Sequence, residues 1–401
     1  MKGTYLISVI ILLAIIAGCG GNKQSTDDLI VVNVTKSYPK KELALHDLFD
    51  VEYVPLETND EFVTTAYTQA IGKEIILDRT RSDIFIFDSN GKGLRKINRM
   101  GQGPEEYISI TGQIALDEDN NEIFVNSFST KTIFVYDLFG NFKRSFVHKG
   151  DSVNAEYAQI DIFDKDNLIC HDSGNNYYNR EDGTFDTTTR NIFWIISKQD
   201  GSVTKEIDIP YTKRIFTRLI YNDNGRRGTI LMRINHLIPY HDSWLVVEPS
   251  SDTIYRYLPD HSMIPFIVRT PSIQSMDPEI FLFPGVLTDR YFFMHVAKKE
   301  YDFEKQEFLS TDLMYDKQEQ ALFETVVYND DFSTKRPVNM WHEILVTTLI
   351  NSEEIAFVEK LEAYQLVEAY EKGQLKGKLK EIAAELDEED NPVIMIAKNK
   401  K

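Results

Sequence analysis

A recurring hairpin unit constrains the fold of this chain more than any other feature of its sequence. In the first copy, the apolar stretch 84–87 (IFIF) leads through an Asp-Ser-Asn-Gly turn into a second stretch, 94–97 (LRKI). Asn-Gly between two such stretches is the strongest short signal for a β-hairpin. Two further copies follow, and the turn glycines Gly91, Gly140 and Gly201 recur at intervals of about 50 to 60 residues.

Two later hairpins are degraded copies of the same unit, and most copies have another apolar stretch about a dozen residues upstream. Each unit of about 50 residues therefore holds roughly four short strands. One four-stranded sheet cannot bury both of its faces alone, so such sheets pack face to face around an axis. The repeat predicts an all-β fold, a β-propeller of about six blades, each a four-stranded antiparallel sheet.

Only five hairpin units are visible, so we expect the sixth blade to combine strands from both ends of the chain. Such a blade would lock the ring. The candidate strands are residues 30–34, 51–54, 344–349 and about 393–397, the last being the closing strand. A β-sandwich or two smaller β domains is the competing layout, which the regular spacing argues against, and seven blades remain an alternative count.

The hydrophobic period changes between residues 352 and 387. Apolar residues recur there every three to four positions, beginning at Ile355, which predicts a C-terminal helical segment. Ser352 is a suitable N-cap. Gly373 and Gly377 indicate a break between two helices. We expect this segment to pack against the propeller, with binding of a partner as the alternative.

The charge and the cysteine content limit the function classes. The formal net charge is −19, and no basic stripe interrupts the acidic composition, so binding to nucleic acid is not expected. The chain has two cysteines, Cys19 and Cys170. If Cys19 is modified, Cys170 has no partner for an intrachain disulfide, and a zinc site built on cysteines is excluded by the same count.

Residues 1–18 are typical of a bacterial lipoprotein signal peptide. Lys2 precedes an apolar run of about thirteen residues, which suits a signal peptide and is too short to span a bilayer. The run ends in Ile-Ala-Gly-Cys, which looks like a lipobox, so we predict a diacylglycerol on Cys19. A plain signal peptide with an incidental cysteine, or an uncleaved anchor, is the alternative.

The residues after the cysteine indicate how the fold is attached. Residues 19–28 are polar and predict a flexible tether, followed by the propeller as a single domain over residues 29–401. No Asp follows Cys19 directly, so the inner-membrane retention signal is missing. We therefore predict an outer-membrane lipoprotein that contacts the membrane through its lipid, and either leaflet remains open.

The order of three short motifs resembles the six-bladed β-propeller lipoproteins of Bacteroides-type bacteria. The motifs are residues 54–58 (VPLET), 101–107 (GQGPEEY) and 391–394 (NPVI). In that family a similar first segment precedes blade one, the second follows the first hairpin, and the third begins a closing strand. The resemblance covers nearly the whole mature chain. It implies a six-bladed, NHL-like propeller on an exported lipoprotein, and it implies no activity.

The GQGPEEY loop is the best candidate for a binding site. Its two glycines permit unusual backbone conformations, and its proline fixes one turn angle. Arg99, Gln102, Glu105 and Tyr107 are the predicted ligand-binding residues, for a sugar or a peptide. The alternative is a structural connection between blades in which Tyr107 is packed and Glu105 caps a backbone group.

No motif predicts a cofactor, a metal site or a catalytic residue. The spacings HExxH and HxH are absent, and the eight histidines are read as scattered surface residues. The acidic stretch 117–120 (DEDN) lacks the glycine and the terminal glutamate of a calcium loop, so it is read as a solvated turn. No nucleophile elbow or P-loop occurs.

Two functions of different class follow. The first is a non-enzymatic module of the cell envelope that binds a glycan, a peptide or an envelope protein. The second is a metal-assisted hydrolase or lyase acting on a carbohydrate or lactone, with ligands contributed by several blades around the central channel. Only the propeller topology supports the second, so we favour the first.

Overall fold

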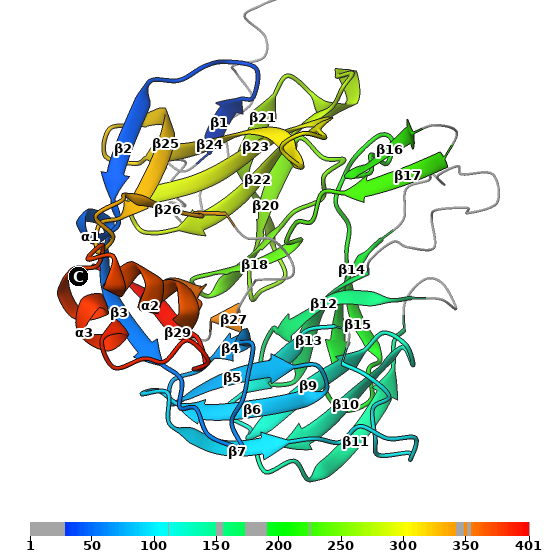
Figure 1. The fold of residues 1–401 in the computed structure, drawn as a ribbon. Coiled ribbons are helices and arrows are strands. Elements are labelled where there is room, and N and C mark those ends of the chain that lie inside the picture. The colour runs from blue at the N-terminus through cyan, green and yellow to red at the C-terminus, as the bar shows by residue number, and fades with distance from the viewer. Residues whose placement is uncertain are drawn as a thin grey trace, which may run out of the picture.

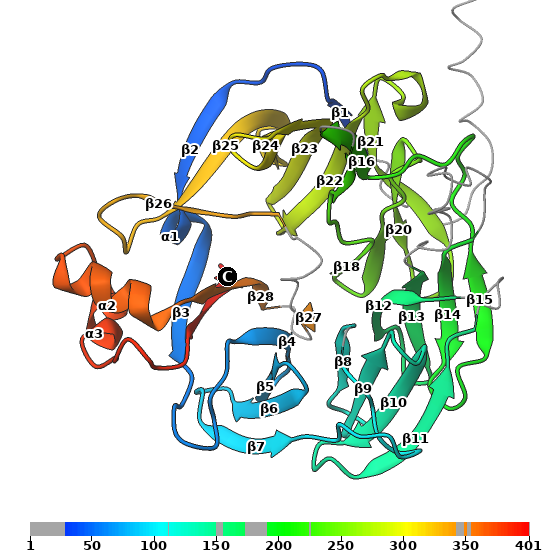
Figure 2. The ribbon, with the colours of Figure 1, turned by 45° about the vertical axis from the view of Figure 1, so that its right-hand side comes forward.

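A computed structural model describes residues 29–110, 112–149, 155–172, 191–223, 226–341, 349–350 and 354–400. In this part of the chain, six sheets stand around a common axis, each with one strand near the axis and one at the periphery (Figure 1, Figure 2). The prediction of an all-β, six-bladed propeller is confirmed. The sandwich and the seven-bladed ring are wrong.

Blades 1 to 3 are four-stranded antiparallel sheets whose strands follow chain order from the axis outward. Blade 1 also has a short parallel strand, β27 (Leu349–Ile350), beside β4 at its inner edge. The strands of these blades are β4 (Tyr67–Ile71), β5 (Ile75–Thr80), β6 (Asp83–Asp88), β7 (Gly93–Ile97), β8 (Ile114–Asp117), β9 (Glu122–Ser127), β10 (Thr132–Asp137), β11 (Phe142–Val147), β12 (Tyr157–Ile162), β13 (Asn167–Asp172), β14 (Phe193–Ser197) and β15 (Val203–Ile207).

Blades 4 and 5 have the same four antiparallel strands plus one outer parallel strand each. Their strands are β18 (Leu237–Tyr240), β19 (Ser243–Val246), β20 (Thr253–Tyr257) and β21 (Met263–Thr270), then β22 (Ile280–Leu287), β23 (Tyr291–Asp302), β24 (Glu307–Asp316) and β25 (Ala321–Asn329). A short strand, β26 (Arg336–Val338), pairs with the second half of β25. Between blades 3 and 4 the chain forms a separate hairpin of β16 (Arg218–Asp223) and β17 (Arg226–Leu231), and a 3₁₀ turn, η3 (Ile273–Ser275), links blades 4 and 5.

The N-terminal strands form a belt around the outside of half of the ring. β1 (Ile30–Asn33) lies on blade 4, and β2 (Lys40–Ala44) lies on blade 5. After the one-turn helix α1 (Leu45–Leu48), β3 (Phe49–Pro55) becomes the outer strand of blade 6. The inner and middle strands of blade 6 come from the C-terminal end, β28 (Ile355–Leu361) and β29 (Val393–Asn399).

The predicted composition of the sixth blade is therefore half right. Residues 51–54 and 393–397 do meet in one sheet, as β3 and β29. Residues 30–34 do not, because Ile30 and Val32 bury their side chains against blade 4, where β1 pairs in parallel with β21. Of the stretch 344–349, only Leu349 lies within the described residues, and it belongs to blade 1.

The helical prediction began too early. Ile355–Leu361 is the strand β28, and the helices are α2 (Ala363–Glu371) and α3 (Gly377–Ala383). A bulge between Ile355 and Phe357 shifts the register of β28 against β29, which helps an i+3 apolar spacing fit a strand. The spacing of the apolar residues favours a helix, but pairing with β29 makes this segment a strand. Ser352, the predicted N-cap, lies outside the described residues.

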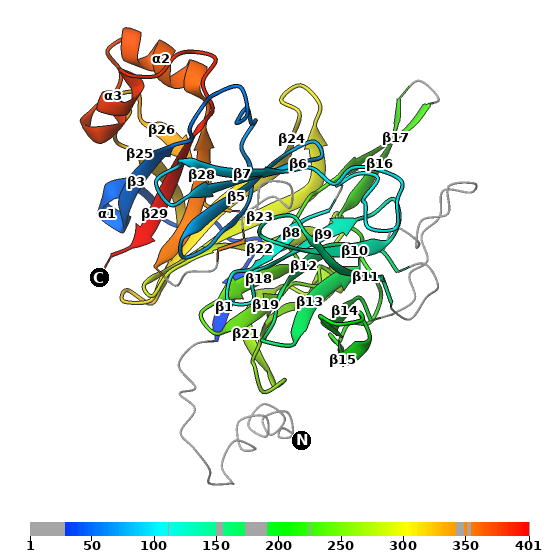
Figure 3. The same ribbon diagram turned by 90° about the horizontal axis from the view of Figure 1, so that it is seen from below.

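The remainder of the helical prediction holds. Gly373 and Gly377 both have positive φ angles, 65° and 55°, and they separate α2 from α3 as expected. Leu366, Leu375 and Leu379 pack into the core that blades 5 and 6 share with α1. Figure 3 shows the two helices beside β3 and α1 at one side of the ring.

Buried amide side chains tie consecutive blades together near the axis. Gln69 of β4 accepts a hydrogen bond from the backbone N–H of Ile114, the first residue of β8 (3.2 Å). Asn126 of β9 donates to the carbonyl oxygen of Tyr157 in β12 (2.8 Å). Gln159 of β12 accepts from the N–H groups of His236 and Leu237 (2.6 and 3.2 Å). These three amides occupy backbone groups that inner strands would otherwise bury unpaired.

The first and last of the three family motifs meet where the ring closes. The side chain of Asn391 is 2% exposed, and its amide donates to the carbonyl oxygens of Glu57 and Phe62 (2.7 and 2.8 Å). Its oxygen accepts from the N–H of Thr64 (2.8 Å). The turn glycine Gly91 adopts φ 84°, and a Cβ there would stand 2.2 Å from the carbonyl oxygen of Pro55. Both contacts hold the N-terminal segment against blade 1 and the C-terminal strand.

Candidate functional site

The four residues predicted to bind ligand in the GQGPEEY loop do not converge. Tyr107 is fully buried, and its hydroxyl accepts from the N–H of Arg99 and donates to the carbonyl oxygen of Ser82 (3.0 and 2.8 Å). The guanidinium of Arg99 donates to the carbonyl oxygen of Gly140, in the hairpin turn of blade 2 (2.7 Å). Both side chains therefore connect blade 1 to blade 2.

The same connection recurs between blades 2 and 3. The hydroxyl of Tyr157, also fully buried, accepts from the N–H of Lys149 (3.1 Å) and donates to the carbonyl oxygen of that lysine. The Lys149 ammonium donates to the carbonyl oxygen of Asp200, in the hairpin turn of blade 3 (2.9 Å). Each tyrosine ring lies 6.1 Å from an aromatic ring on the third strand of the blade that follows the connection, Tyr136 in blade 2 or Trp194 in blade 3. The recurrence identifies a structural device of the repeat.

The other two predicted residues lie nearer the surface. Gln102 lines a groove of about 460 Å³ between the loop and the outer strands of blade 2, with Phe134 and Val147 on the opposite wall. The carbonyl oxygen of Glu105 accepts a hydrogen bond from the hydroxyl of Tyr136 (2.7 Å), so this residue contributes its backbone to the blade contact. Of the four, only Gln102 lines the groove, and ligand binding at this loop stays a prediction.

A smaller and more enclosed pocket lies on blade 5. After Glu324, β25 leaves β24 and pairs with β26, and residues 337–341 then cross the face of the blade toward β22. We call this crossing segment the arch. A pocket of about 320 Å³ lies between the arch and the strands β23 to β25. Its polar lining residues are His295, Ser310, Asp312, Thr325 and Asn339, and its other lining residues are apolar.

Two contacts fix the end of the arch on the inner strand. The carbonyl oxygen of Met340 accepts from the N–H of Val286 in β22 (2.8 Å). A Cβ at Gly285 would stand 2.1 Å from the same carbonyl oxygen. Glycine at this position is therefore required for the close approach of the arch to β22.

An aromatic stack and a hydrogen-bonded pair of side chains form one wall of the pocket. The rings of His295 and Trp341 lie nearly parallel with centroids 4.1 Å apart, and Phe283 stacks with Trp341 at 6.5 Å. Nδ1 of His295 is 2.7 Å from the carboxylate of Asp312. The carboxylate accepts the Nδ1 proton, so in the neutral ring Nε2 carries the lone pair. The pocket thus contains an imidazole ring oriented by Asp312 and stacked on an aromatic side chain.

Sequence reasoning missed this pocket. The strands β23 and β24 form a longer hairpin than the degraded copies of the repeat indicated, and this hairpin places His295 opposite Asp312. Trp341 lies in an irregular segment that no hairpin signal marks. Only the fold brings it onto the ring of His295.

Two other histidines lie together where blades 3 and 4 meet. His171 of blade 3 and His236 of blade 4 stack at 3.7 Å, and burial lowers the pKa of His236 to about 4. The described residues contain no group of three or more His, Cys, Asp or Glu side chains placed to hold a metal ion. His342, which the sequence also offers, lies outside them.

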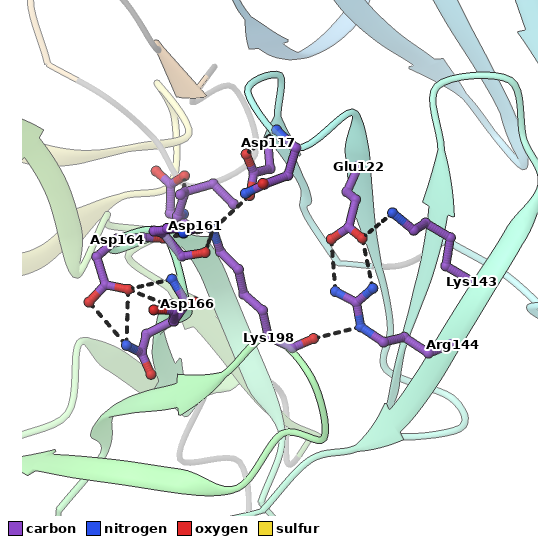
Figure 4. A network of polar contacts seen from close by, with 12 residues as sticks. Asp117, Glu122, Lys143, Arg144, Asp161, Asp164, Asp166 and Lys198 are labelled. Atoms are coloured by element: carbon purple, nitrogen blue, oxygen red, sulfur yellow. Dashed lines mark hydrogen bonds and ion pairs between the residues drawn. The ribbon is translucent and has the colours of Figure 1, made fainter.

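A buried polar network joins blades 2 and 3 (Figure 4). It lies where Asp117 ends β8 and Lys198 follows β14. Asp161 of β12 belongs to it and is 5% exposed. Burial raises the pKa of this carboxyl to about 7, whereas an aspartate in an unfolded chain has a pKa of about 3.9. The folded state therefore binds the proton more tightly. The stabilisation that protonation gives is present below about pH 4 and is lost as the pH rises through 7.

We expect Asp161→Asn to raise the free energy of unfolding by about 2 kcal/mol at pH 8.5 and to have little effect at pH 4. The amide is neutral at both pH values, and its oxygen still accepts from the N–H of Ile162 (2.7 Å). Urea unfolding at the two pH values measures the difference. Asp166→Asn, in the exposed turn of the same network, is the control. An equal gain at both pH values would contradict a raised pKa.

Comparisons with known proteins agree with the fold. A candidate exported protein from Bacteroides fragilis matches with a TM-score of 0.60 and 16% identity, over 93% of this chain and 100% of that chain. A member of the DUF4221 family from Bacteroides vulgatus matches with a TM-score of 0.37 and 9% identity, over 71% of this chain and 90% of that chain. Virginiamycin B lyase from Staphylococcus aureus matches with a TM-score of 0.32 and 10% identity, over 68% and 98%.

The first match establishes a shared fold, and the TM-scores of the other two are too low to support an argument. No curated protein matches the chain. Among the helices of the described part, none has the length and apolar character needed to cross a bilayer. Residues 29–398 match the family described as "Domain of unknown function (DUF4934)", and the chain therefore belongs to that family.

Proposed function

We propose that this chain is a lipid-anchored protein of the bacterial cell envelope that binds a ligand in the arch pocket without converting it. The observation that carries the proposal is the pocket itself. Its volume of about 320 Å³ falls in the range of small-molecule sites, and its wall is mostly apolar with a few polar groups. The hydrogen bond from Val286 to Met340 holds the arch on blade 5, which favours a preformed binding surface.

Anchoring is supported by the sequence around Cys19, which lies outside the described residues, and by the exported character given to the Bacteroides fragilis relative. The proposed location is the outer membrane. Growth with an alkyne-labelled fatty acid tests the anchor: we expect the native chain to take up the label and Cys19→Ser to take up none. Label on the variant would show that the lipid is attached elsewhere.

Binding is tested by filling the pocket. Ser310 is exposed and lines the pocket, so Ser310→Trp places a large ring in it without altering the core. Thr311→Trp is the matched control, since Thr311 is also exposed, is adjacent on β24, and is not among the lining residues. The native chain is titrated calorimetrically with a defined library of oligosaccharides and short peptides.

We expect at least one library member to bind the native chain and Thr311→Trp, and not Ser310→Trp. A ligand that binds all three chains equally would place the site elsewhere. Turnover of a library member by the native chain, lost on changing lining residues, would favour an enzyme over a binding module.

A further inference from the structure

The charges around the arch pocket restrict what it can bind. Among the described residues that line it, none is a lysine or an arginine, and the carboxylate of Asp312 is the only one. An anionic ligand would meet a negative group and no compensating cation. A simple cation would meet one carboxylate that already accepts the Nδ1 proton of His295. The pocket therefore suits an uncharged ligand.

The hydrogen-bonding groups restrict the ligand further. Asp312 and Nε2 of His295 accept, the amide nitrogen of Asn339 donates, and the hydroxyl of Ser310 does both. Asn339 has its oxygen occupied by the N–H of Trp341 (2.9 Å), which orients the amide nitrogen. Thr325 donates its own proton to the carbonyl oxygen of Lys41 (3.0 Å) and can only accept from a ligand. These donors and acceptors are matched by a ligand whose neighbouring atoms can each donate and accept a hydrogen bond. Hydroxyl groups have this property.

The rest of the lining is apolar and partly aromatic. Trp341 and His295 form a flat stack, and Val326 and Pro337 are among the aliphatic lining residues. Such surfaces cover the C–H groups of a ligand whose hydroxyls are hydrogen-bonded at its edge.

From these three properties together, we infer that the arch pocket binds a neutral saccharide. The inference rests on the proposed function and narrows it to one ligand class. It applies to sugar units without carboxylate, sulfate or phosphate groups, which would lie near Asp312.

The test compares neutral with anionic sugars. The probes are maltotriose, cellotriose and mannotriose, with trigalacturonate as the anionic trisaccharide, and calorimetry gives each dissociation constant at pH 7.5. We expect a neutral trisaccharide to bind at least about tenfold more tightly than trigalacturonate, because the anion carries its charge into a site without a cation.

Two variants test the role of the carboxylate. Asp312→Asn should weaken neutral binding about tenfold, since the amide oxygen is a weaker acceptor than the carboxylate, both for the Nδ1 proton of His295 and for a ligand hydroxyl. The same change should reduce the ratio between the dissociation constants of the anionic and the neutral sugars. A loss of protein stability alone would not change this ratio. Asp330→Asn is the matched control, because Asp330 also lies 2.7 Å from a histidine ring nitrogen, that of His46, and is outside the pocket.

The outcomes separate the two proposals. If the anionic sugar or a peptide is the preferred ligand and Ser310→Trp blocks it, the saccharide inference fails and the binding function stands. If Ser310→Trp blocks no ligand of the library, both fail. Unchanged selectivity in Asp312→Asn would also overturn the inference.

Discussion

Replacing Asn391 by alanine is expected to lower the free energy of unfolding by about 3 kcal/mol. The side chain makes three hydrogen bonds to backbone groups of residues 57–64, and each such bond contributes about 1 kcal/mol, with a further cost where a buried group is left unpaired. These bonds join the C-terminal strand to the segment before blade 1. Their loss therefore weakens the closure of the ring. Urea unfolding followed by far-ultraviolet circular dichroism measures the change.

Two further variants show whether the hydrogen bonds are the cause. Asn391→Asp keeps the shape and the acceptor for Thr64, but it turns a carboxylate oxygen toward the carbonyl oxygens of Glu57 and Phe62. We expect it to destabilise at least as much as alanine. Asn222→Ala, on the exposed side of the hairpin β16–β17, should cost less than about 0.5 kcal/mol. A loss of this small size for Asn391→Ala would contradict the role assigned to the side chain.

Lys198→Met is expected to cost about 3 kcal/mol, because it leaves a buried carboxylate without its cation. The ammonium is 2.6 Å from the carboxylate of Asp117, and the two side chains are 3% and 5% exposed (Figure 4). It also donates to the carbonyl oxygen of Asp164 (2.7 Å). Lys198 follows β14 in blade 3 and Asp117 ends β8 in blade 2, so the pair links neighbouring blades.

A double variant separates the ion pair from the packing. Asp117→Leu combined with Lys198→Met removes both charges, and it should recover most of the loss of Lys198→Met. The control is Lys143→Met in the same network. Lys143 is 39% exposed, and its partner Glu122 keeps Arg144, so the cost should stay below about 1 kcal/mol. If the double variant is as unstable as the single one, the buried charge is not the reason for the loss.

The parts of the fold that the sequence predicted well are those with local causes. Turns such as Asp137 to Gly140 force the chain into hairpins between residues close in sequence, and the glycine adopts the required positive φ of 83°. The family motifs indicated which segments close the ring, and the segments 54–58 and 391–394 do meet there. The hairpin repeat accounted for five blades, and the sixth was predicted from strands at both ends of the chain.

The parts that the sequence did not predict depend on distant partners. β1 pairs in parallel with β21, and β2 pairs in parallel with β25, and neither pairing leaves a turn or a period in the sequence. At Ile355 the local period favoured a helix, and the pairing of β28 with β29 prevailed. The arch pocket depends on Trp341, which only the complete blade brings onto His295.

The N-terminal belt also determines at which stage of folding the ring can close. The chain is synthesised from its N-terminus, so β1, β2 and β3 emerge long before the strands they pair with. β3 has to wait for Val393–Asn399, the final strand. Three strands near the N-terminal end therefore remain unpaired until late in folding, and a chain that lacked residues 393–401 would leave β3 without its partner strand.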